Sequence, residues 1–462
     1  MANVKCPHRR VSPVSAVTLT FEDGTIRVSG LTERTARDLP HVEYDPRSKT
    51  ARAPAMHYPE IRDALAAAAD VDDCVLSLAA VPSLSSTYDL RPYQQAALDA
   101  WQAAGNRGVL ELPTGSGKTV IGLGAIEALQ TPTLVVVPTI DLLTQWRDEL
   151  ETEFDCPIGQ LGGGEQTLEP ITVSTYHSAY LKADSIGDRF GLVIFDEVHH
   201  LGGEGFRQIA RLLAAPARLG LTATFEREDD AHEVIETLVG PLCYTIEIDD
   251  LAGEHLANYD IKRLTVELTP EERREYERHQ SVFTDYLAAS NIHLRSGSDY
   301  QKLVMRSGTD PRAREALLAK QRAREVMMNS QAKLDSLATI LNRHRGDRII
   351  VFTAHNALVY RISERFLIPA ITHRTGTKER RDVLRKFRSG EFSRVVTANV
   401  LDEGVDVPDA NVAVVLSGSG SEREFTQRLG RILRPKADGG RAVLYELVSK
   451  ETAEEGVANR RR

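Results

Sequence analysis

The chain of 462 residues contains only four cysteines, and none of them stands at metal-ligand spacing from another. Cys6, Cys74, Cys156 and Cys243 lie far apart, without a CxxC pair and without a histidine at ligand spacing beside them. This pattern argues against a disulfide framework and against a structural zinc site. We expect four ordinary buried thiols.

Long hydrophobic runs are missing as well. No apolar segment approaches the roughly 18 residues that a membrane helix needs. The segment 1–10 is polar, and no apolar stretch that would make a secretory signal follows it. Hydrophobic residues at 42% and charged residues at 27% are values typical of globular domains, which excludes wholesale disorder. We therefore expect a soluble, intracellular protein.

An excess of positive charge is also lacking. The 57 Lys+Arg and 66 Asp+Glu residues leave a net charge of −9, which argues against a surface coated all over with cations for nucleic acid. A local basic track stays open. Lysine itself is scarce, because 12 of the 57 cations are Lys and 45 are Arg, the side chain suited to bidentate phosphate contacts. Composition alone can produce the same bias.

The first part of the chain has a β-rich pattern. Apolar residues alternate with polar ones on both sides of Asp23-Gly24, a two-residue turn, and predict a β hairpin. A proline at position 59 opens an Ala-rich stretch and predicts a helix over 59–69. We therefore predict a small α+β domain over 1–80, followed by a linker rich in Ser and Thr at 81–87.

Short, wholly apolar runs bounded by Gly, Pro or Asp make up most of the remainder. Such runs are typical of the buried strands of a parallel sheet that helices cover on both faces. They occur in two series, 109–112, 134–137, 171–173, 192–195 and 219–221, then 349–352, 370–371, 395–396, 412–416 and 443–447. The sequence predicts two tandem, doubly wound parallel-sheet domains, over 88–245 and 246–450.

A charged segment with few β-branched runs, 268–329, lies between the two series and predicts helices. Within it, 302–324 carries seven Lys or Arg and two acidic residues, so its local charge is +5 in an acidic chain. A solvated helix face is the ordinary interpretation of such a run. A nucleic-acid contact is the alternative.

A glycine-rich loop directly follows the first apolar run, and helix-compatible residues follow the loop. In a strand–loop–helix context the loop N–H groups and the helix N-terminus face a phosphate, Lys118 reaches the β/γ oxygens, and the Thr119 hydroxyl ligates Mg²⁺. Glycines at 115 and 117 permit close backbone approach. The expected nucleotide contacts in this loop are Pro113, Thr114, Gly115, Ser116, Gly117, Lys118 and Thr119.

Two acidic residues end the fourth apolar run. Asp196 and Glu197 stand at the carboxyl edge of a predicted parallel strand, where a carboxylate that holds Mg²⁺ belongs. We expect Asp196 to hold the metal together with Thr119, and Glu197 to act as the base that polarises the attacking water. His199 and His200 lack a third ligand at metal spacing, so no metal is assigned to them.

These residues, with the motifs around them, resemble superfamily 2 helicases and more closely the XPB family, over about residues 90–435. The similarity implies that Arg91 and Gln94 lie on the adenine side of the nucleotide. It also implies contacts to one DNA strand and a link between hydrolysis and strand movement. The motifs that carry it in the first domain are LRPYQ at 90–94, VVPT at 136–139, STY at 174–176 and LTAT at 221–224.

The second domain carries the remaining motifs of the resemblance. They are VFT at 351–353, LDEGVDVP at 401–408 and QRLGRILR at 427–434. By similarity, Gly404 and Asp406 lie near the ribose, and Gln427, Arg431 and Arg434 complete the catalytic site from across a cleft. An arginine there neutralises charge in the loose transition state of phosphoryl transfer. The resemblance implies two tandem RecA-like domains with a helical, thumb-like insertion at about 268–329.

Two further features narrow the resemblance. Arg227, Glu228 and Asp229 are similar to the RED loop of XPB proteins, which is linked to opening the duplex. The basic insertion sits where that family carries its DNA-gripping thumb, and by position 1–80 corresponds to the damage-recognition domain. The thumb residues expected to contact DNA are Lys302, Arg306, Arg312 and Arg314. For the basic cluster at 374–388 we favour a solvated face.

The resemblance implies an ATP-dependent DNA helicase or duplex opener with 3′–5′ polarity, which uses ATP and Mg²⁺ in nucleotide excision repair and possibly also in transcription. We expect a monomer that contacts DNA without regard to sequence, in the cytoplasm of a prokaryote and associated with its nucleoid. One alternative is a double-stranded DNA translocase that never separates strands. Another is an ATP-gated DNA-binding scaffold for a partner nuclease. An RNA helicase is disfavoured, because residues 196–200 depart from the DEAD form.

Overall fold

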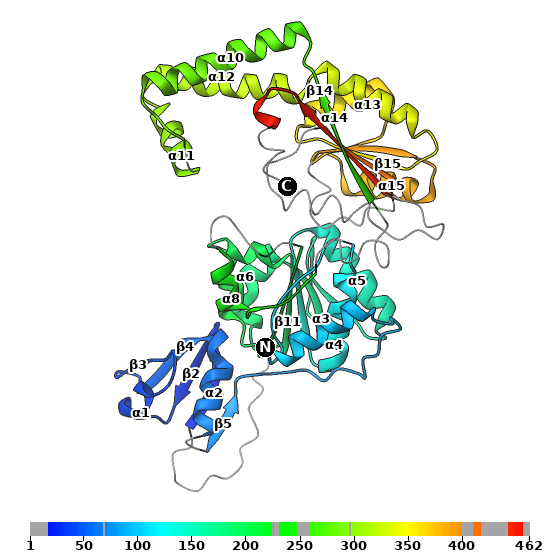
Figure 1. The fold of residues 1–462 in the computed structure, drawn as a ribbon. Helices are drawn as coiled ribbons and strands as arrows, with labels where there is room; N and C mark the ends of the chain where they lie inside the picture. Colours follow the sequence, from blue (N-terminus) through cyan, green and yellow to red (C-terminus); the bar gives the residue numbers. More distant parts are fainter. Residues whose placement is uncertain are drawn as a thin grey trace. The chain divides into compact units, whose positions relative to one another are not determined.

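The protein is described from a computed structural model, which covers residues 17–67, 70–113, 115–223, 225, 231–246, 259–294, 297–398, 410–416 and 442–455. The chain folds into two compact units that divide principally between Leu251 and Ala252 (Figure 1). The first unit holds a small N-terminal sheet and a large parallel sheet, and the second holds a further parallel sheet and a helical insertion.

The N-terminal sheet has five strands in the order β3-β4-β2-β1-β5. Its strands are β1 (Val17–Glu22), β2 (Thr25–Ser29), β3 (Glu43–Asp45), β4 (Thr50–Pro54) and β5 (Val71–Cys74). Strands β1 and β2 pair antiparallel around Asp23 (φ 46°) and Gly24 (φ 78°), so the predicted hairpin is confirmed. The helical elements are α1 (Glu33–Arg37), η1 (Ala55–His57) and α2 (Tyr58–Ala66). The predicted helix is confirmed, and it ends at Ala66, earlier than expected.

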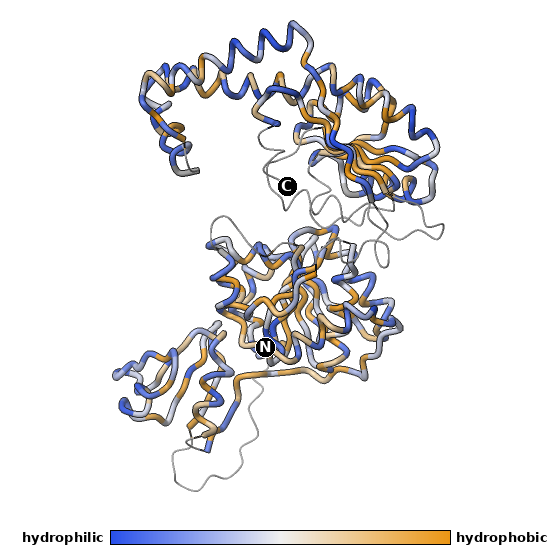
Figure 2. Tube along the Cα trace, in the orientation of Figure 1, coloured by the Kyte–Doolittle hydropathy of each residue, from blue (hydrophilic) through white to orange (hydrophobic). Residues whose placement is uncertain are grey.

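The large sheet of the first unit has eight strands in the order β13-β6-β12-β11-β7-β10-β8-β9. They are β6 (Arg107–Glu111), β7 (Thr133–Val137), β8 (Ile158–Gly162), β9 (Glu165–Thr167), β10 (Ile171–Thr175), β11 (Leu192–Asp196), β12 (Ala217–Thr222) and β13 (Leu242–Thr245). All of the pairs are parallel except β8 with β9. The five predicted runs are therefore confirmed as strands of a parallel sheet. Figure 2 shows these strands as predominantly hydrophobic segments.

Helices connect the strands of this sheet. They are α3 (Pro92–Ala103), α4 (Lys118–Leu129), α5 (Ile140–Glu153), α6 (Tyr176–Ile186), the 3₁₀ segment η2 (Val198–Gly202), α7 (Arg207–Leu212) and α8 (Ala231–Leu238). Hydroxyl caps fix two of the starts, because the Thr139 and Thr175 side chains accept hydrogen bonds from backbone N–H groups of the first turns of α5 and α6.

The parallel sheet of the second unit has six strands in the order β14-β19-β18-β15-β17-β16. They are β14 (Tyr259–Val266), β15 (Ile349–Phe352), β16 (Ala370–Ile371), β17 (Arg394–Thr397), β18 (Val412–Val415) and β19 (Ala442–Ser449), and all of their pairs are parallel. Its helices are α13 (Gln331–Arg343), α14 (Asn356–Phe366) and α15 (Thr377–Ser389). The second predicted series is thereby confirmed.

Three helices, α10 (Pro270–Ala289), α11 (Gly297–Arg306) and α12 (Pro311–Met328), form the insertion. A capping box between Thr269 and Glu272, with a proline in the first turn, starts α10. Small residues of α12, Ala313 and Ala316, pack against Phe283 of α10. Helices α10 and α12 therefore lie side by side (Figure 1), and the predicted helical insertion is confirmed.

The expectation of buried thiols is wrong for the cysteines that the structure describes. Cys74, Cys156 and Cys243 are thiols outside any disulfide and are only partly buried. Cys74 and Cys243 lie on the edge strands β5 and β13, where one side stays open, and Cys156 lies in the connection between α5 and β8. Cys6 lies outside the described residues. Among the described helices, none combines the length and the apolar character that crossing a bilayer requires.

Candidate nucleotide-binding site

The glycine-rich loop connects β6 to α4, and its two glycines have a left-handed backbone. Gly115 has φ 86° and Gly117, the N-cap of α4, has φ 82°, a region that L side chains rarely adopt. A Cβ atom on residue 117 would come within 2.5 Å of Nε2 of Gln94. The loop therefore needs glycine at 117 for both conformation and space. It turns the backbone into the N-terminus of α4, where N–H groups can face an anion.

Two side chains of α3 support the loop from behind. The Gln94 amide, 3% exposed, donates to the Ser116 carbonyl (2.8 Å), and the Tyr93 hydroxyl donates to the same oxygen (2.6 Å). The Arg91 N–H donates to Oε1 of Gln94 (2.9 Å), which fixes the direction of the amide. The Arg91 side chain is exposed on this helix start and donates to the Tyr93 hydroxyl (3.4 Å). The predicted pair Arg91 and Gln94 thus adjoins the loop, and Tyr93 is a contact that the sequence did not predict.

The Lys118 side chain contacts both the glycine-rich loop and Glu197, which follows β11. Its Nζ atom donates to the Leu112 carbonyl (3.2 Å) and lies 3.9 Å from Oε1 of Glu197. Strands β6 and β11 both flank β12, so their carboxyl ends meet at one edge of the sheet. The fold therefore brings together side chains that are 79 residues apart in the sequence.

Asp196 is 5% exposed, and both of its carboxylate oxygens accept hydrogen bonds. The indole Nε1 of Trp146, on α5, donates to Oδ2 (2.8 Å), and the Glu197 N–H donates to Oδ1 (3.0 Å). Burial, and then the charge of Glu197, raise the pKa of Asp196 to about 6, against the opposing effect of Lys118. A cation at this carboxylate would favour its ionised form.

Glu197 has φ 49°, a left-handed backbone that is uncommon for a residue other than glycine. Its side chain is buried, and Oε2 accepts no hydrogen bond from the described residues although Nδ1 of His199 lies 3.5 Å away. The Ser116 hydroxyl, also buried, likewise has no hydrogen-bond partner in the described part of the chain. Carboxylate and hydroxyl oxygens suit Mg²⁺ and its water, so the residues here fit a magnesium–nucleotide complex.

Further hydrogen bonds connect the acidic pair to the neighbouring motifs. The Tyr176 hydroxyl, at the start of α6, donates to the Asp196 carbonyl (3.1 Å), and its burial raises the pKa of the Tyr176 hydroxyl well above its usual range. Nδ1 of His199 lies 3.3 Å from the hydroxyl of Thr222 at the end of β12. The STY motif therefore contacts the acidic pair directly, and Thr222 of the LTAT motif contacts His199, which lies beside Glu197.

Nine of the expected site residues lie outside the described residues. They are Thr114, Arg227, Glu228, Asp229, Gly404, Asp406, Gln427, Arg431 and Arg434. Of the other expected loop residues, Pro113 lies just after β6 and Thr119 lies in the first turn of α4.

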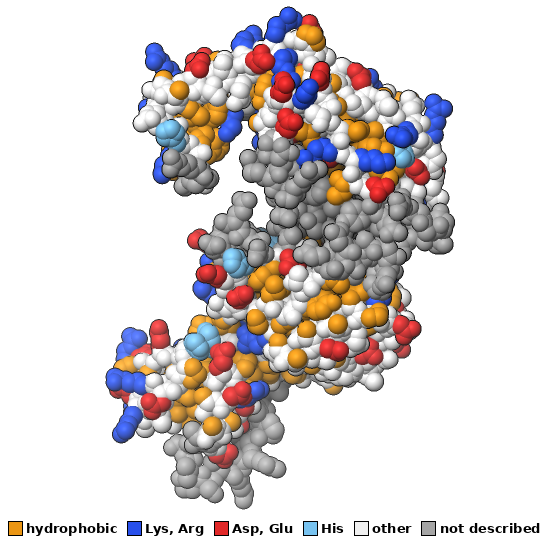
Figure 3. Space-filling view, viewed as in Figure 1, with side chains coloured by type: hydrophobic (Ala, Val, Ile, Leu, Met, Phe, Trp, Pro, Cys, Tyr) orange, Lys and Arg blue, Asp and Glu red, His pale blue; other side chains and the backbone are white. Residues whose placement is uncertain are grey.

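The expected thumb contacts are exposed residues of the helical insertion. Lys302 and Arg306 lie on α11, and Arg312 and Arg314 lie on α12. Two of the four have an acidic neighbour, because Lys302 lies 3.4 Å from Asp299 and Arg306 lies 3.4 Å from Asp310. Figure 3 shows basic and acidic side chains mixed over this segment. Such exposed pairs contribute little stability and leave the cations accessible.

Three segments of the chain match families of known proteins. Residues 19–75 match the "Xeroderma pigmentosum group B helicase damage recognition domain". Residues 87–227 match "Type III restriction enzyme, res subunit", and residues 313–462 match "ERCC3/RAD25/XPB C-terminal helicase". Two of the three family descriptions thus name XPB.

Relatives are similar over most of the chain. The DNA 3′-5′ translocase XPB2 of Sulfurisphaera tokodaii is 43% identical over 92% of this chain and 96% of the relative. The DNA 3′-5′ helicase XPB of Mycobacterium tuberculosis is 31% identical over 81% of this chain and 63% of its own length. The yeast (Saccharomyces cerevisiae) general transcription and DNA repair factor IIH helicase/translocase subunit XPB/SSL2 is 29% identical over 80% of this chain and 43% of its length.

A solved structure supports the architecture. The Pyrococcus furiosus Hef helicase domain superposes with a TM-score of 0.52 at 19% identity, over 81% of this chain and 98% of that domain. At this identity the likeness shows the fold alone, and it confirms the predicted tandem RecA-like architecture. With the two XPB-specific segments and a relative that is 43% identical over nearly its whole length, the resemblance is confirmed, and the chain belongs to the XPB family of helicases.

Proposed function

We propose that this chain hydrolyses ATP to move along DNA with 3′–5′ polarity and to open duplexes. The observation that carries the proposal is the buried cluster of Lys118, Asp196 and Glu197 beside a left-handed, glycine-rich loop. This arrangement has the charges and the open acceptor that phosphoryl transfer to water needs. The names of the relatives at 43% and 31% identity support the DNA substrate and the polarity.

Each residue of the cluster has a separate proposed role. Lys118 and the loop N–H groups would hold the β- and γ-phosphates, and Gln94 with Tyr93 would keep the loop in place. Thr119 and Asp196 would hold Mg²⁺, which supplies positive charge against the phosphate oxygens. Oε2 of Glu197, which accepts no hydrogen bond from the described residues, would accept a proton from the attacking water.

The second RecA-like domain would complete the site. We propose that Arg431 and Arg434 neutralise the γ-phosphate in the transition state, together with Gln427, and that Gly404 and Asp406 lie near the ribose. A planar guanidinium is suited to this role because it forms two parallel hydrogen bonds to a phosphate. Such an arginine raises turnover by roughly three to five powers of ten.

Movement along DNA would follow from closing and opening of the two domains around the nucleotide. The VVPT and STY motifs would hold one strand by sequence-independent backbone contacts. The cations of α11 and α12 would add electrostatic grip, and Arg227, Glu228 and Asp229 would help to open the duplex. We also propose a division into three domains, 1–80, 88–245 and 246–450, with the N-terminal domain serving damage recognition.

The biological setting is part of the same proposal. We propose a monomer that acts in nucleotide excision repair, in the nucleoid of a prokaryotic cytoplasm. The factor IIH name of the yeast relative supports a role in repair and in transcription. A partner nuclease, for which this chain would serve as an ATP-gated scaffold, is the alternative that copurification would test.

Translocation on duplex DNA without strand separation is the second candidate function. The name of the relative at 43% identity, a translocase, favours it. A triplex-displacement assay beside a strand-displacement assay on the same DNA distinguishes the two. A duplex opener displaces both the third strand and the complementary strand, whereas a pure translocase displaces only the third strand. Glu197→Gln is the control, because loss of ATP turnover in this variant shows that the turnover of wild type comes from this site. If wild type hydrolyses ATP in this way and still releases neither strand, the motor proposal is wrong.

A further inference from the structure

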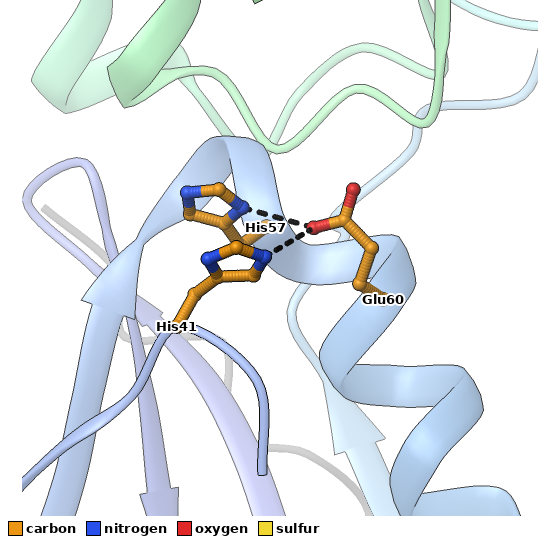
Figure 4. A group of neighbouring side chains, drawn as sticks. All are labelled: His41, His57 and Glu60. Atoms are coloured by element: carbon orange, nitrogen blue, oxygen red, sulfur yellow. Dashed lines mark hydrogen bonds and ion pairs between the residues drawn. The ribbon is translucent and has the colours of Figure 1, made fainter. Parts of the chain in front are cut away.

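Three potential metal ligands meet in the N-terminal sheet segment, outside the nucleotide site. The imidazoles of His41 and His57 stack with their centroids 3.8 Å apart and an interplanar angle of 13°. Nδ1 of His57 lies 2.9 Å from Oε2 of Glu60, and Nε2 of His41 lies 3.8 Å from the same oxygen. Figure 4 shows both rings directed at this one carboxylate oxygen. The three ligand atoms all lie within 4.8 Å of one another.

The local backbone holds these side chains in place. His41 has φ 61°, a left-handed conformation, in the connection between α1 and β3. His57 ends η1, and Glu60 follows three residues later in the first turn of α2, which contains Pro59. A spacing of three places His57 and Glu60 on one face, and the proline restricts the turn that joins them. The left-handed backbone at His41 places a second imidazole beside the hydrogen-bonded pair of His57 and Glu60.

We propose that His41 Nε2, His57 Nδ1 and Glu60 Oε2 form a binding site for a divalent metal ion of the zinc class. Two imidazoles and one carboxylate are a ligand set that zinc accepts, with further positions left for water. Metal–ligand distances of about 2.0–2.1 Å place tetrahedral ligands about 3.3 Å apart. His41 Nε2 and Glu60 Oε2, 3.8 Å apart, must therefore come closer, and His57 Nδ1 and Glu60 Oε2, 2.9 Å apart, must separate slightly; the half-exposed side chains of His41 and Glu60 can do both by rotating.

Arg107 of β6 sets the strength of such a site. Its Nη1 atom lies 3.9 Å from Oε1 of Glu60, the oxygen that does not face the histidines. The two carboxylate oxygens thus separate the guanidinium from the metal position. The positive charge of Arg107, with the buried Arg218 behind it, opposes a second cation, so we expect a site of modest affinity. A bound ion would lie beside the ion pair that links the N-terminal segment to the first RecA-like sheet.

Titration of the full-length chain with Zn²⁺ by calorimetry, and with Co²⁺ by visible absorption, tests the proposal. Wild type should bind one ion at this site. His57→Gln, Glu60→Gln and His41→Asn should each weaken binding by at least about tenfold. Asparagine is chosen at 41 because it tolerates a left-handed backbone. Matched controls are His293→Gln and Glu364→Gln, which change an exposed histidine and an exposed acid elsewhere and should bind as wild type does.

The thermal melt of each variant without metal shows whether it folds. Zn²⁺ should raise the melting temperature of wild type and of the controls, and it should leave Glu60→Gln unchanged, because ligand binding stabilises only a folded site. Equal Zn²⁺ affinity in all variants would overturn the proposal, and so would no binding by wild type. An intense near-ultraviolet thiolate band with Co²⁺ would place the ion on cysteines and would also overturn it.

Discussion

Each RecA-like sheet of this chain has a loop that connects a buried strand to a helix, and only one of the two loops has the features that hold a phosphate. In the first sheet, β6 leads to α4 through two left-handed glycines and a lysine. In the second, β15 leads to α14 through Thr353-Ala354-His355, without glycine or lysine. The folds are alike, but the loops differ in conformation and charge. Function here belongs to the loop and not to the sheet.

The two sheets also differ in how each accommodates a buried cation. Arg218 of β12 donates to three backbone carbonyls, of Ala215, Leu238 and Leu213, and burial lowers its pKa to about 9. In the second unit, Lys333 of α13 donates to the Leu416 carbonyl and to both carboxylate oxygens of Glu454. Carbonyl dipoles satisfy the first cation, whereas the second also has a full counter-charge. The burial of Lys333 therefore depends on one other side chain, Glu454, whereas the burial of Arg218 depends on backbone carbonyls.

The largest effect should follow from removing the cation of the first loop. Lys118→Ala should lower DNA-stimulated ATP turnover by about 10²–10³-fold, because the phosphates lose a preorganised charge. His355→Gln, in the corresponding loop of the second sheet, should leave turnover essentially unchanged. Steady-state phosphate release measures both. If Lys118→Ala were as active as wild type, the loop after β6 would not be the phosphate-binding loop.

Breaking the ion pair of the second unit should mainly reduce stability. Glu454→Gln leaves the Lys333 ammonium buried without its counter-charge, and the free energy of unfolding should fall by about 3–5 kcal/mol. Glu364→Gln, an exposed acid on α14, should change it by less than about 0.5 kcal/mol. Urea unfolding followed by circular dichroism gives both values. Equal midpoints for the two variants would contradict the pairing.

A moderate effect is expected from the indole that holds Asp196. Trp146→Phe removes the donor to Oδ2 and keeps a ring against Gly122, so kcat should fall by about tenfold with the fold retained. Trp101→Phe is the matched control, because its indole donates to the Arg218 carbonyl, away from the acidic pair. It should lower the melting temperature and leave kcat unchanged. Equal kcat for both variants would remove Trp146 from the site.

The smallest effect concerns DNA affinity. Arg312→Glu and Arg314→Glu on α12 should weaken DNA binding and lower the slope of log K against log salt by about 0.7–0.9 for each phosphate that the protein no longer neutralises. Arg385→Glu with Arg388→Glu on α15 is the control, because we interpret that basic face as solvated. Fluorescence anisotropy at several salt concentrations measures the slopes. A larger loss in the α15 variant would reverse the assignment of the two basic surfaces.

These comparisons also show which parts of the fold could be predicted from sequence. The central strands β7, β11 and β15 are wholly buried, because both faces of a parallel sheet are covered, and their apolar runs at 134–137, 192–195 and 349–352 predicted them. Two of the edge strands, β5 and β9, were missed. Strand β9 (Glu165–Thr167) is entirely exposed and β5 carries two aspartates, so no apolar run marks either.

The candidate site divides in the same way. Lys118 and Asp196 stand in contiguous motifs whose order along the chain predicted their roles. Trp146 was missed, because its contact to Asp196 spans 50 residues and depends on how α5 packs on the sheet. The cluster of His41, His57 and Glu60 was missed for a similar reason, since the left-handed backbone at His41 is invisible in the sequence.

The central claim is that Glu197 drives hydrolysis at the first loop and that hydrolysis drives movement on DNA. The most direct test measures ATP binding, ATP turnover and triplex displacement by Glu197→Gln on the same DNA. We predict ATP and DNA affinities close to those of wild type, turnover lower by about 10²–10⁴-fold, and no displacement. Turnover and displacement at wild-type rates in this variant would contradict the account.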